Sequence, residues 1–537
     1  MRLPCSPQID IMQLLTADTS LMDSIAALFS YDAAKPLSLM SSTFMVMLLI
    51  FGVGYMAVRR RVTLRTIYVV CFSLFVYYKM SGVYLLLLLG VALSDYLIAH
   101  RVAESRERGK SARRWVALSA TINILILVYF TASNFIAESI TTLYGSGTLD
   151  WEPVVKIVGV SFFVFQSLAY VIDVSRGTVA PLCRIEDYLF MLSFFPKIVC
   201  GPLVKARDFI PQIGSSAEVS REDMGRAVTL IATGLLKFTL ISQVLGTLFV
   251  GPAFAGKLGD GGMVSLLAIY GFTMQLYCDF SGFSDFAVGL ALMMGFRLPD
   301  NFDAPYKSAT ITEFWRRWHI SLSSWLREYL YISLGGNRKG KIRTYVNLFL
   351  TMFLGGLWHG VSLTFMAWGA LHGIALALHK VWLSLVPGAK KVGAEMRPIW
   401  RVLATLLTLH VVAFGWLLFN APDMQTVGTM LHNIAHNFSF AELGALDTLS
   451  KIAVATMLIG YILHYLPRSA NDRVREGITR MGFVGMMVVM VATIWVVGQC
   501  NTMLADYRAA ESKAIAESSN GEITTSSNAG LPAYGAF

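Results

Sequence analysis

The sequence predicts an all-α protein that crosses a membrane many times. Of its 537 residues, 55% are apolar and only 15% are charged, and the mean hydropathy is +0.58. A soluble chain of this size has too small an interior to bury so many apolar side chains behind a charged surface. The apolar residues also gather in runs of roughly 20, the length that a helix needs to cross a bilayer core of about 30 Å.

These runs predict about eleven to thirteen crossings. The predicted spans are 39–58, 66–80, 82–99, 115–134, 154–172, 225–250, 263–296, 344–362, 363–383, 398–420, 450–466 and 481–500.

The charged residues predict how the chain is oriented. Segments 59–65, 101–114, 384–397 and 467–480 are basic, whereas 135–153 carries acidic residues and no basic one. Cytoplasmic loops of membrane proteins carry an excess of Lys and Arg, so the basic loops are predicted to lie in the cytoplasm. This placement predicts a multi-pass protein of the cell inner membrane. It also explains the net charge of +10 without a nucleic-acid partner.

The chain divides into three predicted parts. Residues 1–35 are predicted to be an extracytoplasmic N-terminal segment without a cleavable signal, because the first long apolar run begins near Leu39. Residues 36–505 form the transmembrane domain. Residues 506–537 are polar and unpatterned, and are predicted to be a disordered tail.

Two stretches of the transmembrane domain do not read as simple spans. The region 183–212 is apolar but broken by Pro and Gly, and the region 299–343 is both aromatic and basic. Irregular backbone at membrane depth is tolerated only inside protein or beside a wet cavity. Both are therefore predicted to be re-entrant segments around a site.

The sequence from Ile311 to Tyr331 is predicted to be one amphipathic helix with an aromatic stripe and an opposite charged face. His319 falls at the edge of the stripe, beside Trp315 and near Trp318 and Trp325. Such an apolar wall would partly desolvate a proton-transfer group. The alternative is an interfacial helix with an incidental histidine.

His359 is the only ionisable residue in the predicted span from Val346 to Ser362. Ionisable groups at membrane depth are costly and commonly functional. Gly356 and Gly360 flank it and would allow a backbone or an acyl chain to approach. The alternative is a histidine that only hydrogen-bonds between packed helices.

Other ionisable residues carry less specific signals. His372 is predicted to bond across helices, or to support His359. His432 and His436 have the i, i+4 spacing of metal ligands but no evident third ligand, so no metal site is predicted. Asp279 and Asp285 lie with Ser281 in an apolar segment, where carboxylates need partners. Those partners are expected among the arginines at 297, 316 and 317.

Several motifs are missing. No Gly-x-Ser-x-Gly elbow, phosphate-binding Walker loop or Gly-x-Gly-x-x-Gly turn occurs in the sequence. A serine hydrolase and an ATP-driven transporter are therefore not supported.

Taken together, the motifs resemble the membrane-bound O-acyltransferases, in particular the bacterial alginate O-acetyltransferase branch, over about residues 155–385. The resemblance implies that this stretch is the catalytic core of the transmembrane domain. The resemblance rests on the runs QLYCDFSGFSD from Gln275, EFWRRWHISLS from Glu313, LGGNR from Leu334 and GLWHG from Gly356, with FQSLAYVID from Phe165 and SFFPK from Ser193.

The resemblance implies that His359 is the principal catalytic histidine and that His319 is the second. It also implies that the transmembrane helices and the re-entrant or interfacial helices form a ring around a central tunnel, which joins a cytoplasmic donor site to an outer acceptor site. The residues expected to bind substrate or line this tunnel are Trp315, Trp318, Trp325, Trp358, Asn337, Arg338, Gly356, Gly360, Asp279 and Ser281.

The expected reaction transfers an acyl group, acetyl above others, from acetyl-CoA or another thioester donor to a hydroxyl. No tightly bound cofactor or metal is expected. Lys307, Arg338, Lys339 and Lys341 are expected to attract the donor's phosphates. The expected acceptor is an exported polysaccharide or a periplasmic SGNH-type transferase. The alternatives are D-alanyl transfer to teichoic acid, a non-enzymatic acyl-donor channel, and a transporter.

Overall fold

The computed structural model describes residues 29–33, 35–144, 154, 157–215, 218–386 and 397–518, and over these residues the chain is helical without a β-strand. The amino-terminal half of the fold consists of α3 (Ser42–Val58), α4 (Val62–Ser81), α5 (Leu85–Glu107), α6 (Arg113–Tyr144), α7 (Val160–Arg176), α8 (Ile185–Ser193), α9 (Ala206–Ile213), α10 (Arg221–Leu236), α11 (Gly251–Phe254) and α12 (Gly262–Met293). Two π-helical segments, Lys237–Gln243 and Gly246–Val250, continue α10 toward α11.

The carboxyl-terminal half begins with three short segments, α13 (Ile311–Arg317), α14 (Ile320–Trp325) and the π-helix Leu326–Tyr331. Longer helices follow them. These are α15 (Lys341–His359), α16 (Leu363–Leu385), α17 (Pro398–Asn420), α18 (Met424–His436), α19 (Glu442–Ala445), α20 (Thr448–Tyr465), α21 (Arg468–Arg480) and α22 (Gly482–Ser518).

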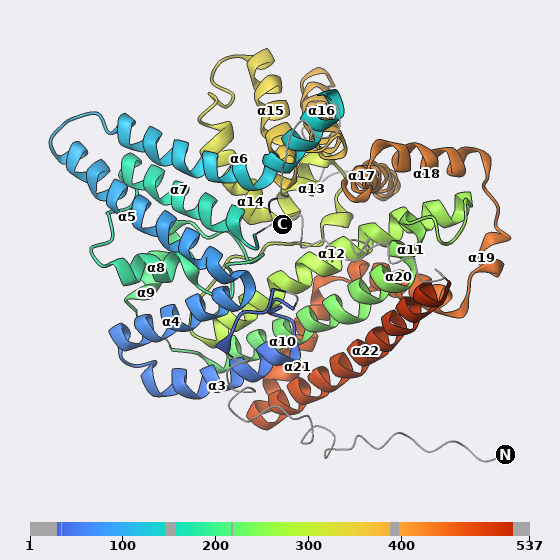
Figure 1. Ribbon diagram of the computed structural model, residues 1–537, viewed down its shortest axis with the longest axis horizontal. Coiled ribbons are helices and arrows are strands. Elements are labelled where there is room, and N and C mark those ends of the chain that lie inside the picture. Colours follow the sequence, from blue (N-terminus) through green and yellow to red (C-terminus); the bar gives the residue numbers. More distant parts are fainter. Residues whose placement is uncertain are drawn as a thin grey trace.

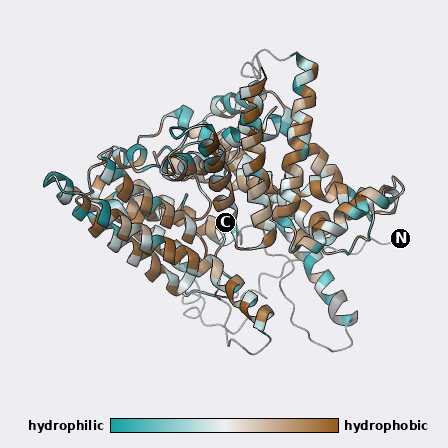
Figure 2. Ribbon diagram, turned by 90° about the horizontal axis from the view of Figure 1, so that it is seen from above, coloured by the Kyte–Doolittle hydropathy of each residue, from teal (hydrophilic) through white to brown (hydrophobic). Residues whose placement is uncertain are grey.

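The all-α polytopic membrane fold is confirmed. Seven helical segments within the described residues are long and apolar enough to cross a bilayer. They are Val62–Glu107, Arg113–Tyr144, Arg221–Phe254, Gly262–Met293, Pro398–Asn420, Thr448–Tyr465 and Gly482–Ala514. The predicted spans 39–58, 154–172, 344–362 and 363–383 correspond to α3, α7, α15 and α16, which are shorter or less apolar than these seven. Apolar residues cover most of the helices, and polar residues gather near their ends and in loops (Figure 2).

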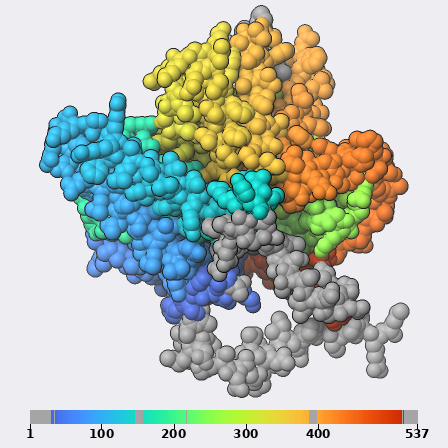
Figure 3. Space-filling model, turned by 45° about the horizontal axis from the view of Figure 1, so that its top comes forward, coloured from blue at the N-terminus to red at the C-terminus, as the bar shows by residue number. Residues whose placement is uncertain are grey.

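Helix α12 forms the centre of the molecule, and most of its side chains are buried. It packs against α10, α17, α18 and α20 (Figure 1). Helices α5, α6 and α7 pack together on one side. Helices α15 and α16 form an antiparallel pair at the top of the view and stand out from the surface in Figure 3.

The prediction of one helix from Ile311 to Tyr331 is wrong. The helix stops at Arg317, and His319 adopts a left-handed backbone conformation with φ 42° and ψ 56°. Chain direction therefore changes at this histidine, and the next helix begins at Ile320. The amphipathic pattern has the helical period in both α13 and α14, but such a pattern cannot show that one residue between them has a positive φ.

Two other regions show how the sequence pattern relates to the fold. Between α8 and α9 the chain is irregular and buried, and the Lys197 ammonium donates hydrogen bonds to the Gln166 side chain and the Met191 carbonyl. At the carboxyl end, α22 continues to Ser518, so residues 506–518 are helical instead of disordered. The rest of the predicted tail, and most of the segment 1–35, lie outside the described residues.

Candidate active site

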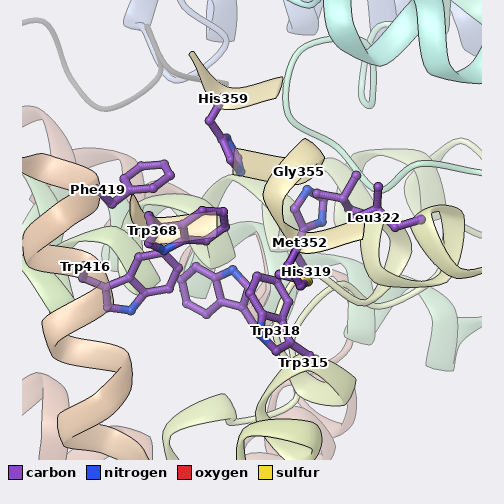
Figure 4. Close-up of a pocket in the computed structure, with 11 residues that line it drawn as sticks. Trp315, Trp318, His319, Leu322, Met352, Gly355, His359, Trp368, Trp416 and Phe419 are labelled. Atoms are coloured by element: carbon purple, nitrogen blue, oxygen red, sulfur yellow. The ribbon is translucent and has the colours of Figure 1, made fainter. Parts of the chain in front are cut away.

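A narrow cavity of about 20 Å³ lies where the α13–α14 break meets α15, α16 and α17 (Figure 4). This volume holds roughly one water molecule. Its walls are almost entirely aromatic and aliphatic, and its two ionisable groups are imidazoles. The lining residues are Trp315, Trp318, His319, Leu322, Leu326, Met352, Gly355, His359, Trp368, Trp416 and Phe419.

His319 enters the cavity from the break between α13 and α14. Its side chain is 2% exposed, and the edge-to-face contact with Phe280 brings the two ring centroids to 4.6 Å. Nδ1 lies 3.1 Å from Oδ1 of Asn301. Nε2 is buried and has no hydrogen-bond partner among the described protein atoms. An unpaired ring nitrogen in an apolar cavity is costly, and it is the kind of group that a substrate can satisfy.

His359 approaches from the opposite wall, as the last residue of α15. Its ring meets the edges of Trp368 and Phe419 at centroid distances of 5.3 and 5.0 Å. Unlike His319, it is half-buried. The structure therefore brings the two predicted histidines, 40 positions apart in sequence, to one cavity.

The predicted tryptophans divide into two groups. Trp315 and Trp318 line the cavity. Trp325 and Trp358 lie behind it, where both stack on Phe165 at centroid distances of 4.2 and 5.3 Å. The Trp325 indole also donates a hydrogen bond to the Phe165 carbonyl at 3.1 Å. These two tryptophans therefore join α7 to the cavity wall without facing the cavity.

Sequence reasoning missed three aromatic residues of the wall, Trp368, Trp416 and Phe419. The last two lie on α17, beyond the predicted catalytic core of about 155–385. Their i, i+3 spacing in an apolar span was the available signal. It is the ordinary pattern of a packed helix face, so it does not point to a site.

A second, larger pocket of about 610 Å³ adjoins the cavity and shares Trp315, Leu326 and Met352 with it. We call it the vestibule. Its other lining residues are Thr312, Arg316, Ile320, Ser323, Ser324, Arg327, Tyr331, Asn337, Leu348, Thr351, Leu376 and Lys380. Hydroxyls and cations thus line the space next to the apolar cavity.

The three cations of the vestibule are Arg316, Arg327 and Lys380. None of them forms an ion pair within 4.0 Å with a carboxylate of the described chain. The predicted Asn337 lines this pocket, but the predicted phosphate-attracting residues do not. Arg338 is exposed outside it, and the Lys307 ammonium donates to the Leu466 carbonyl at 2.7 Å.

The predicted glycines serve helix packing. A Cβ atom at Gly356 would lie 2.5 Å from the Phe365 carbonyl oxygen and 3.1 Å from Cα of Gly369, so this glycine lets α15 and α16 approach closely. A Cβ atom at Gly360 would lie 2.8 Å from the Phe365 ring. Gly355, one residue earlier, is the glycine that lines the cavity.

Asp279 and Ser281 are buried in α12 and line neither pocket. The Ser242 hydroxyl donates to the Asp279 carboxylate at 3.1 Å. Asp285 pairs with Lys237 of the π-helix at 2.6 Å. The partner expected among Arg297, Arg316 and Arg317 is therefore a lysine from another helix, which sequence spacing alone does not reveal.

The remaining histidines are placed as follows. The Trp315 indole donates to Nδ1 of His372 at 3.3 Å, which is the predicted bond across helices. His432 and His436 stack with ring centroids 4.3 Å apart. Within the part of the chain that the structure describes, no three His, Cys, Asp or Glu side chains gather as a metal site.

Comparison with known proteins identifies the family to which this chain belongs. Residues 183–404 match the model of the membrane-bound O-acyltransferase family. The chain is 39% identical over 386 residues to the probable alginate O-acetylase of Pseudomonas syringae pv. tomato, covering 70% of this chain and 71% of that protein.

Two further relatives widen the comparison. The peptidoglycan O-acetyltransferase of Helicobacter pylori is 30% identical over 67% of this chain and 72% of its own length. The teichoic acid D-alanyltransferase of Streptococcus thermophilus is 30% identical over 50% of this chain and 69% of its own length. The chain belongs to the membrane-bound O-acyltransferase family. It is an enzyme, an O-acyltransferase.

Proposed function

We propose that this O-acyltransferase moves an acetyl group from a cytoplasmic thioester, across the membrane, to a hydroxyl on the outer side. The observation that carries the proposal is the pair of imidazoles, His319 and His359, that line one apolar cavity. Two proton-transfer groups in a nearly dry passage are what acyl transfer to an alcohol requires.

The proposed reaction needs a base, because an alcohol is a poor nucleophile. Neutral His359 accepts the hydroxyl proton as the oxygen attacks the thioester carbonyl carbon, and the C–O bond forms. The C–S bond then breaks, and the thiolate takes a proton from an imidazolium in the cavity. General-base help of this kind contributes about 10²–10⁴-fold. His319 is the second imidazole for these proton transfers.

A small acyl group is supported by the size of the cavity. The indole rings of Trp318, Trp368 and Trp416 pack against one another, with centroids 4.7 Å apart for Trp318–Trp416 and 6.0 Å apart for Trp368–Trp416. They leave about 20 Å³. A long acyl chain would have to displace them, whereas an acetyl group needs little room.

The vestibule is the proposed donor side. It lies against Leu348, toward the start of α15, and against Lys380, toward the end of α16. The adjoining segments 338–343 and 384–397 are basic, which supports a cytoplasmic position. The unpaired cations Arg316, Arg327 and Lys380 suit the phosphates of acetyl-CoA or of a carrier-linked thioester.

The acceptor is proposed to be an exported polysaccharide or a periplasmic SGNH-type transferase that passes the acetyl group on. The resemblance to the alginate O-acetylase covers 70% of the chain, whereas the resemblance to the D-alanyltransferase covers 50%. D-alanyl transfer is therefore the second candidate.

The test is acetyl transfer by the purified protein in lipid nanodiscs. Labelled acetyl-CoA is supplied with alginate or peptidoglycan fragments as acceptors, and D-alanyl thioester is supplied in a parallel reaction. The wild type is expected to transfer acetyl, and His359→Ala and His319→Ala are each expected to lose about 10²-fold or more. His432→Ala, remote from the cavity, is the matched control. Acetyl transfer that survives both cavity variants would overturn the proposed site, and D-alanyl transfer alone would replace acetyl as the cargo.

A further inference from the structure

The segment 301–303, which precedes α13, packs against the chain break that presents His319. The Asp303 amide donates to the Arg317 carbonyl at 3.0 Å, and the Ile320 amide donates to the Asn301 carbonyl at 2.9 Å. Residues before and after His319, which has a left-handed backbone conformation, thus form backbone hydrogen bonds to the same neighbouring segment. Asn301 is the member of that segment whose side chain reaches the histidine.

The side-chain oxygen of Asn301 has three neighbours. The Ser321 amide donates to it at 3.1 Å and the Ser321 hydroxyl at 2.9 Å. Nδ1 of His319 lies 3.1 Å away. Asn301 is 3% exposed, so water does not compete for these bonds.

One of these contacts fixes the orientation of the amide. A backbone N–H can only donate, so the atom of Asn301 that faces the Ser321 amide must be the oxygen and not the NH₂ group. The same oxygen faces Nδ1 of His319. Because an amide oxygen can only accept, Nδ1 must carry a hydrogen.

The consequence concerns the other ring nitrogen. A neutral imidazole carries one hydrogen, so with Nδ1 protonated the Nε2 atom of His319 holds a lone pair. Nε2 is the buried atom that has no hydrogen-bond partner among the described residues. The lone pair is therefore available on a ring that lines the cavity.

We infer that Asn301 is a positioning residue that presets His319 as a proton acceptor for acyl transfer. The inference rests on the proposed function. In the reaction Nε2 receives the proton that His359 has taken from the hydroxyl, while Nδ1–H stays on the Asn301 oxygen, and Nε2 then gives this proton to the departing thiolate. Neutral His319 cannot donate a hydrogen bond from Nε2, so it does not polarise the thioester carbonyl before it has taken a proton.

Asparagine suits this task better than aspartate. A carboxylate at position 301 would accept the same hydrogen bonds, but its charge would also stabilise the imidazolium and hold the proton on His319. Among the residues that the structure describes, the other titratable group that lines the cavity with this ring is His359 of α15. The neighbours Phe280, Trp318 and Leu322 carry no charge.

The first experiment compares Asn301→Ala with a matched control in the acetyl-transfer assay. Ser321→Ala removes another hydrogen bond to the same oxygen, together with the one that the Ser321 hydroxyl accepts from the Leu203 amide, without touching the histidine. Asn301→Ala is expected to lose about tenfold or more in turnover, a part of the roughly 10²–10⁴-fold that a general base contributes, and Ser321→Ala much less. In the His319→Ala background, Asn301→Ala is expected to cost nothing further, because the residue acts through the imidazole.

The second experiment uses the pH profile of Asn301→Asp, which keeps the hydrogen-bond acceptor. The acid limb of turnover is expected to move to higher pH by about one unit or more, as a nearby opposite charge does. If Asn301 has only a structural role, the acid limb of the Asn301→Asp profile stays where it is in the wild type. Asn301→Ala then also lowers turnover further in the His319→Ala background. Either result would overturn the inference. If the wild type transfers nothing, the proposed function has failed instead. Melting temperatures in the same nanodiscs identify variants that do not fold.

Discussion

The contact between α15 and α16 gives a prediction with a worked magnitude. In Gly356→Ala the new Cβ atom would start 2.5 Å from the Phe365 carbonyl oxygen, below the 3.0 Å that real Cβ contacts keep. Both neighbours are helix backbone and cannot rotate away. The two helices must therefore separate locally by about 0.5 Å.

This separation affects both stability and activity. Overpacking destabilises the fold by about 1–3 kcal/mol. Alanine has a higher helix propensity than glycine, which stabilises α15 by about 1 kcal/mol. The net destabilisation is therefore about 1 kcal/mol. His359 lies three residues further along α15, and Trp368 adjoins the facing Gly369 on α16. A 1 Å misplacement of catalytic groups can cost about 10²-fold, so a shift of half that size is expected to lower turnover by about tenfold.

The assay combines labelled acetyl transfer with thermal melting in nanodiscs. Gly90→Ala is the matched control, because Gly90 lies in the interior of α5 and a Cβ atom there meets nothing within 4 Å. The control is expected to keep full turnover and an equal or higher melting temperature. The reasoning would be refuted by Gly356→Ala with wild-type turnover and an unchanged melting temperature.

Three more predictions concern charged groups. Arg316→Gln is expected to raise the KM for the thioester donor about tenfold with little change in kcat. The control is Arg338→Gln, at an exposed position outside the vestibule, which should leave both constants unchanged. Steady-state kinetics at two salt concentrations distinguishes the two variants. Lys237→Met should destabilise the protein by about 3 kcal/mol, since it leaves the Asp285 carboxylate without its partner, and Lys237→Met with Asp285→Leu should recover much of the melting temperature. The pKa of the Glu328 carboxyl lies below its usual value, because hydrogen bonds and charge from Lys205 and Arg207 outweigh the opposing effect of burial. A carboxyl with a lowered folded pKa stabilises the fold above its unfolded pKa, here about 4.5, and loses that contribution as the pH falls below it. Glu328→Gln should therefore melt lower than wild type at pH 7, and the difference should shrink in acid.

Composition and hydrophobic runs predicted the membrane fold well, because lipid imposes long apolar helices that composition reveals directly. The spans at α10, α12, α17 and α20 lie close to the predicted ranges. The break at His319 could not be predicted, since hydrophobic periodicity reports which face a residue occupies and not whether its φ is positive. The end of α22 was missed for a related reason: residues 506–518 are polar, but they include Ala, Glu and Lys, which are good helix formers.

The site was predicted in part. His319 and His359 were identified because an ionisable residue among apolar residues can be recognised from the sequence alone. Trp368, Trp416 and Asn301 were missed because tryptophans in a span and an asparagine in a loop have ordinary explanations. Their place at the candidate site follows only from the way α13, α14, α16 and α17 pack together. The pairing of Lys237 with Asp285 is of the same kind, as it joins residues 48 positions apart in two helices.

The geometry of α15 has a consequence for which donors the enzyme accepts. The helix passes Leu348 at the vestibule and ends at His359 in the cavity. Eleven residues of rigid helix correspond to roughly 16 Å along the axis. The helix therefore sets a fixed distance between the proposed phosphate site and the histidine proposed to accept the proton. A thioester whose arm is shortened by a few bonds should bind at the cations and still leave its carbonyl out of reach.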